Sequence, residues 1–134
     1  MWSLSEKRTL QLCVALAGMV AVLAGAWGVI DGPDGTTAGL TNHERYLSGL
    51  LLAIGLAFWS TLSDIEHKTG QFRLLTTLVV IGGLCRLVGV AIGDGLSWPI
   101  MGPMLMELIV APLLCLWQSR LGPATLLAKV WRPF

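Results

Sequence analysis

The sequence predicts an all-α integral membrane protein: one four-helix bundle whose helices run up-down-up-down. Hydrophobic residues make up 54 % of the 134 residues and charged residues only 13 %, about half the roughly 25 % found in soluble domains. The apolar residues also fall into four long runs, none of which alternates with the period of two expected of membrane β-strands. Since lipid offers backbone groups no water, such runs must be helical. Residues 1–134 therefore form a single transmembrane domain.

The four predicted spans cover residues 9–30, 46–62, 74–92 and 99–117. They contain 17 to 22 residues each, close to the ~20 that cross a bilayer core. The connections between them are short, which favours antiparallel neighbours. The first run also resembles a signal peptide, with a small-residue step at residues 24–26, but its length favours a membrane span.

Local motifs predict where individual spans begin, bend and end. Thr41–Glu44 matches a capping box, so we expect Thr41 to cap the second span. Pro99 suits the first turn of the fourth span, and Pro112 lies deeper in it, where proline kinks a helix. The C-terminal residues 121–134 mix apolar and basic side chains and predict a short interfacial segment. A disordered tail is the alternative.

The basic residues predict the orientation of the spans. Seven of the nine precede the first span, connect the second to the third, or follow the fourth: Lys7, Arg8, Lys68, Arg73, Arg120, Lys129 and Arg132. The positive-inside rule then places both termini in the cytoplasm. The six tryptophans agree, since they fall near the ends of spans, where amphipathic rings prefer to lie. We therefore expect a multi-pass protein of the cytoplasmic membrane, with the lipid bilayer as its surroundings.

Small residues predict how the spans pack. Gly82, Gly83, Gly89 and Gly93 share one helical face with Arg86. Such faces let helix backbones approach closely in lipid. We expect these glycines, together with Pro112, to shape the packing inside the bundle, although they are also typical of a homodimer face.

Two ionisable residues lie well inside the spans, Arg86 in the third and Glu107 in the fourth. Each is about seven or eight residues from the outer end of its span, or ~10–12 Å deep. Charges at such depth need a partner, so we expect the two to pair across antiparallel neighbours as a buried ion pair. Arg45, at the outer end of the second span, is expected to join them.

This cluster supports three interpretations. A structural ion pair would hold the helix register, because a guanidinium and a carboxylate satisfy each other. An outward-facing pocket would instead use the surplus positive charge of Arg45 and Arg86 over Glu107 to hold an anion. A proton relay through Glu107 is the third interpretation.

Other chemistries find little support in the sequence. We predict no metal site, because His43 and His67 fall at opposite membrane faces, and no cofactor, because the nucleotide and hydrolase fingerprints are missing. The net charge of +1 argues against nucleic-acid binding. The cysteines, Cys13, Cys85 and Cys115, are scattered and predict no disulfide framework. We therefore predict no enzyme activity.

Three motifs in order resemble a known family. They are R-Y-x-x-G at Arg45, GG-x-x-R at Gly82, and E-x-x-x-x-P-x-x-x-x-W at Glu107, within residues 42–121. The chain resembles small bacterial four-span membrane proteins classed as a domain of unknown function, which are loosely similar to DoxX-type proteins. The resemblance implies a bacterial inner-membrane protein with four helices, and it implies motif positions for Arg45, Arg86, Glu107, Pro112 and Trp117. It implies no activity.

The sequence thus favours a non-catalytic four-span module that acts through helix packing or as a subunit of a larger membrane complex. Its partner would be another membrane protein or a second copy of the chain. The alternative is a binder or carrier of a small anionic or amphiphilic molecule at the cluster of Arg86, Glu107 and Arg45.

Overall fold

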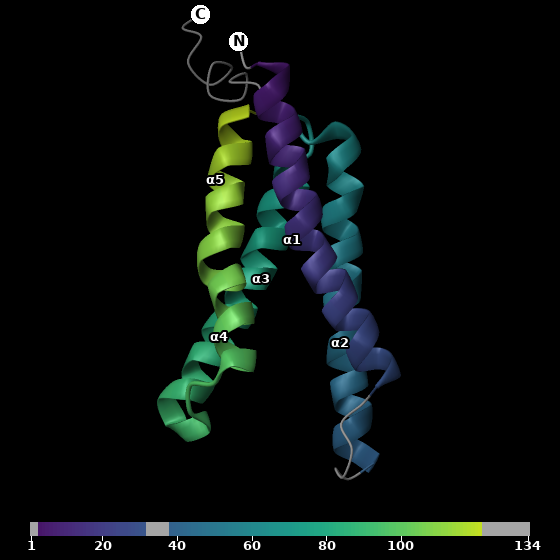
Figure 1. The fold of residues 1–134 in the computed structure, drawn as a ribbon, viewed down its shortest axis with the longest axis vertical. Helices are drawn as coiled ribbons and strands as arrows, with labels where there is room; N and C mark the ends of the chain where they lie inside the picture. The colour runs from purple at the N-terminus through teal and green to yellow at the C-terminus, as the bar shows by residue number, and fades with distance from the viewer. Residues whose placement is uncertain (1–2, 32–37, 122–134) are drawn as a thin grey trace, which may run out of the picture.

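The computed structural model describes residues 3–31 and 38–121, and it is helical throughout its regular elements (Figure 1). The α-helices are α1 (Leu4–Ile30), α2 (Ala38–Thr61), α3 (Thr69–Gly89), α4 (Trp98–Leu105) and α5 (Ala111–Leu121). A 3-10 turn, η1 (Leu62–Asp64), follows α2, and π-helical segments η2 (Val90–Asp94) and η3 (Met106–Val110) follow α3 and α4. Because η3 joins α4 to α5, the last three elements make one span. The predicted all-α, four-helix fold is confirmed.

Each of the four spans is long and apolar enough to cross a membrane. They contain 24 to 27 residues, more than the ~20 that a bilayer core requires. The helices begin earlier than the apolar runs that predicted them, because their polar first turns lie beyond the hydrocarbon length. The prediction that Thr41 caps the second span is wrong, since α2 already begins at Ala38. A capping box is instead found at Ser3, whose side chain accepts from the Glu6 amide at 3.3 Å.

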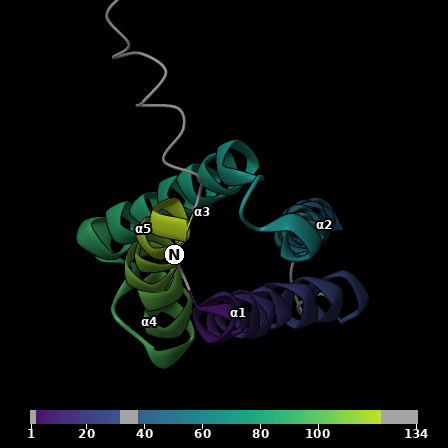
Figure 2. The same ribbon diagram turned by 90° about the horizontal axis from the view of Figure 1, so that it is seen from above.

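The spans form two hairpins, α1 with α2 and α3 with α4–η3–α5. In Figure 1 they stand close at the end where α1 begins and diverge toward the other end, and Figure 2 shows the same two groups from above. Glycines bring α1 and α2 together: a Cβ at Gly25 would lie 2.5 Å from the backbone nitrogen of Leu52. At Gly18 the indole of Trp59 occupies the space, and its Nε1 donates to the Ala15 carbonyl at 3.1 Å.

The main core lies at the end where the hairpins meet. Its buried members come from α1, the α2–α3 connection, α3 and α5: Leu10, Val14, Ile65, Phe72 and Leu121. Gln118 on α5 is fully buried beside them, and its Nε2 donates to the Ile65 carbonyl at 2.6 Å and to Thr69 Oγ1 at 2.9 Å. These contacts attach the fourth span to the connection between the second and third.

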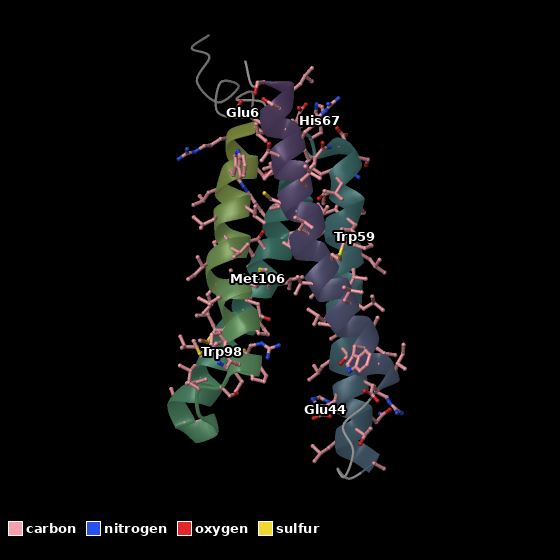
Figure 3. The ribbon with its side chains drawn as sticks, in the orientation of Figure 1. Glu6, Glu44, Trp59, His67, Trp98 and Met106 are labelled. Carbon is pink, nitrogen blue, oxygen red and sulfur yellow. The ribbon has the colours of Figure 1, made fainter. Side chains whose placement is uncertain are left out.

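Exposed ion pairs surround this end of the molecule, where Glu6 and His67 are labelled in Figure 3. Lys7 Nζ, on α1, lies 3.1 Å from Glu66 Oε1, in the connection between α2 and α3. His67 Nδ1 lies 2.7 Å from a carboxylate oxygen of Asp64, and this hydrogen bond raises the pKa of the His67 imidazole. Exposed pairs of this kind contribute little to the free energy of folding.

Proline and glycine decide where the helices are irregular. Pro99 lies in the first turn of α4, as predicted. The π-helical segment Met106–Val110 ends directly before Ala111 and Pro112, where a proline has no N–H for the preceding turn. The third span ends at Gly93, whose φ of 124° glycine adopts without strain. The predicted interfacial segment at 121–134 lies outside the described residues from 122 onward.

Candidate functional site

Arg86 and Glu107 lie side by side between the third and fourth spans. Arg86 is near the end of α3 and Glu107 is in η3. The guanidinium Nε of Arg86 donates to both carboxylate oxygens of Glu107, at 3.2 Å and 3.1 Å. The contact follows from the topology, because the two residues have similar depths in adjacent antiparallel helices.

The prediction that this ion pair is buried is wrong. The Arg86 side chain is 42 % exposed and that of Glu107 is 14 % exposed. The reason is the divergence of the two hairpins, which leaves one side of the guanidinium without protein. Both described hydrogen bonds use Nε, and among the described residues the two terminal nitrogens of Arg86 have no hydrogen-bond partner.

A cavity of about 1020 Å³ lies between the hairpins, and side chains from all four spans line it. Val14, Phe58, Phe72 and Leu114 belong both to its wall and to the core or the layer packed on it. The core therefore closes the cavity where the hairpins meet. Toward the other end the wall continues past the ion pair. Within residues 3–31 and 38–121, the charged members of the wall are Arg86 and Glu107, and its other members are almost wholly apolar.

Arg45 does not join this cluster. It is an exposed residue of α2 and is not part of the cavity wall. Figure 3 labels its neighbour Glu44 on one hairpin and Trp98 on the other, with the two hairpins apart at this depth. Its place at the outer end of the second span did not bring it to the ion pair, because α2 packs mainly against α1. The positive surplus that favoured an anion pocket is therefore absent from the described wall.

The four glycines around Arg86 differ in their surroundings. A Cβ at Gly83 would lie 2.8 Å from a methyl carbon of Leu108 and 2.9 Å from the Cβ of Glu107. Gly82 and Gly93 have open space where a Cβ would stand, and Gly89 is half-buried. Of these glycines, Gly83 is therefore the one at which the structure shows the third and fourth spans in close contact.

We expect Gly83→Ala to destabilise the protein and to move Glu107 away from Arg86. The added methyl group meets the base of the Glu107 side chain, which cannot rotate aside, and overpacking of this kind costs ~1–3 kcal/mol. Gly82→Ala is the matched control, because the same change one residue earlier meets no atom within 4 Å. Thermal unfolding in detergent measures both, and equal midpoints for the two variants would contradict the expectation.

Sequence reasoning missed most of the cavity wall. Its aliphatic and aromatic residues are typical of any membrane span, so their types carry no signal. The arrangement of glycines in α1 and α2 was the available sign, since Gly18, Gly25 and Gly55 favour pairing within one hairpin over packing against the other.

A model of one protein family matches residues 9–118, a range that includes most of the four spans and both members of the ion pair. The chain belongs to this family, described as a domain of unknown function (DUF4345). The resemblance to a four-span family of unknown function is thereby confirmed, and the similarity to DoxX-type proteins stays a prediction. No curated protein and no solved structure matches the chain.

Within the described residues, histidine, cysteine and acidic side chains do not gather in the groups of three that hold a metal ion. The groups that the site offers to a ligand are therefore the side chains of the cavity wall. It combines a long apolar surface with one guanidinium edge and one partly covered carboxylate.

Proposed function

We propose that this protein binds an amphiphilic molecule in the cavity between its two hairpins. The cavity is the single observation that supports this. Its volume of about 1020 Å³ is close to the upper limit of the ~300–1,000 Å³ typical of ligand pockets. A bundle acting only through packing among its own helices has no need of such a space, so the cavity favours an occupant from outside the chain.

The composition of the wall indicates the kind of ligand. Ligand pockets are mostly apolar and carry a few polar groups that orient the ligand. Here the apolar residues, such as Leu50, Ile54 and Val79, suit a hydrocarbon chain. Arg86 and Glu107 provide one polar point at which a head group can be held.

Mass spectrometry of the intact protein, released from a gentle detergent, tests the proposal. We expect a co-purifying lipid-like molecule at a stoichiometry near one. Gly82→Phe should displace it, because Gly82 lines the cavity and has room for a larger side chain. Gly49→Phe is the control: Gly49 has similar open space but is not part of the wall.

The outcomes separate the two candidate functions. Retention of the ligand in the Gly82→Phe variant would place the bound molecule elsewhere and overturn the proposal. A stoichiometric protein partner or second copy in place of a ligand would support the packing module, because a partner helix could occupy the same space.

We further propose that the protein lies in the cytoplasmic membrane of a bacterium with the core end toward the cytoplasm. The support is the gathering of basic residues at that end, on α1, at the α2–α3 connection and on α5: Lys7, Arg8, Lys68, Arg73 and Arg120. Such an excess is typical of cytoplasmic ends.

Single cysteines placed in a cysteine-free background test this orientation. A thiol reagent that cannot cross the membrane should label Asn42→Cys in intact cells, because Asn42 is exposed near the start of α2. His67→Cys, in the connection that follows the opposite end of this span, should be labelled only after the cells are opened. The reverse pattern would invert the topology.

A further inference from the structure

The charge of the cavity wall restricts what its polar point can hold. Among the described residues, the charged members of the wall are Arg86 and Glu107, and they are paired at 3.1 Å, so their formal charges cancel. Arg45, which would have added a second positive charge, is not part of the wall. The part of the wall that the structure describes therefore presents dipoles and hydrogen-bonding groups without a net charge.

The pair offers donors in excess of acceptors. A guanidinium carries five N–H groups, and only that of Nε is used, by both oxygens of Glu107. The N–H groups of the two terminal nitrogens face no acceptor among the described residues, and the Arg86 side chain is 42 % exposed. The Glu107 side chain is more covered, at 14 % exposed. The site is thus complementary to a ligand group that accepts hydrogen bonds.

An anionic head group fits this environment poorly. A carboxylate or sulfonate placed at the free edge of Arg86 would be attracted by the guanidinium, but Glu107 already balances that charge, so the bound anion would leave a net negative charge close to Glu107. Apolar surroundings strengthen that repulsion and make the unbalanced charge costly to bury. An ester or amide carbonyl accepts the same hydrogen bonds, but it is not repelled by Glu107 and adds no net charge to the cavity.

We propose that the cavity selects an amphiphile with an uncharged carbonyl head group, held by the terminal N–H groups of Arg86. This inference rests on the proposed function. Glu107 has a positioning role: it balances the charge of Arg86 and binds Nε, so that the terminal N–H groups of this cavity-lining residue are left for a ligand. Removal of the Glu107 charge should therefore change the preferred ligand.

Competition between three probes of equal chain length tests the inference. The full-length protein, freed of lipid, is offered methyl hexadecanoate, hexadecanesulfonate and hexadecane, and complexes are counted by mass spectrometry of the intact protein. We expect the ester to exceed the permanently charged sulfonate about tenfold and to exceed the alkane severalfold. Sulfonate binding as well as or better than the ester would overturn the inference.

Two variants assign the selectivity to the pair. Glu107→Gln leaves one uncompensated cation in the wall, and we expect the sulfonate to overtake the ester. Should that variant not fold, Arg86→Met with Glu107→Met leaves no charge unpaired. In this double variant the ester should lose its advantage over hexadecane, and an advantage that persists would contradict the role of Arg86.

The same experiment separates this inference from the proposed function. If no probe binds the wild-type protein, or if Gly82→Phe leaves binding of all three unchanged, the cavity is not the binding site. If binding occurs in the cavity but follows a different order of head groups, the binding function stands and the head-group assignment fails.

Discussion

Replacing Gly25 by leucine should separate α1 from α2 and destabilise the protein by about 3 kcal/mol. A Cβ at this position would lie 2.5 Å from the backbone nitrogen of Leu52 and 2.7 Å from the carbonyl oxygen of Ser48. Backbone atoms cannot rotate aside as a side chain can, so the two helices must move apart. Close approach through small residues is what holds helices together in lipid.

The matched control is Gly49→Leu in the same hairpin, where a Cβ would meet no atom within 4 Å. Unfolding by sodium dodecyl sulfate, followed by the fluorescence of the tryptophans, measures both variants. Trp59 packs against Gly18 on the same interface and should report the separation. Unchanged stability of Gly25→Leu relative to the control would show that the hairpin does not depend on this contact.

Phe72→Ala should have the second large effect, a loss of about 3–5 kcal/mol, typical of removing a buried phenylalanine. Phe72 is 1 % exposed and packs edge-on against Phe58, with ring centroids 5.2 Å apart. It belongs both to the core that joins the hairpins and to the cavity wall. Its removal should therefore weaken the junction and extend the cavity toward the core.

Leu74→Ala provides the comparison, because Leu74 lies two residues further along α3 and is 61 % exposed. Thermal unfolding gives the two losses in stability, and spin labels on α2 and α4 measure the distance between the hairpins. We expect a lower midpoint and a broader distance distribution for Phe72→Ala alone. Equal behaviour of the two variants would mean that the core does not join the hairpins.

The sequence was sufficient to predict the properties that depend only on a residue's position along its own helix. Composition and run length predicted four apolar helices, because each span must satisfy its own backbone whatever its neighbours do. Short connections predicted antiparallel order. The pairing of Arg86 with Glu107 needed only their similar depths in adjacent spans, and the structure describes it at 3.1 Å.

Only the tertiary structure decided which faces of the helices meet. Arg45 lies on the hairpin that diverges from the pair and is not part of the wall. Gly82 faces open space, while Gly83 one residue later packs closely. These outcomes depend on the rotation of each helix and on the glycine contacts that join α1 to α2. In an almost uniformly apolar span, hydrophobicity does not specify that rotation, because lipid and protein interior are alike to an aliphatic side chain. For this reason the exposure of the ion pair and the cavity beside it could not be read from the sequence.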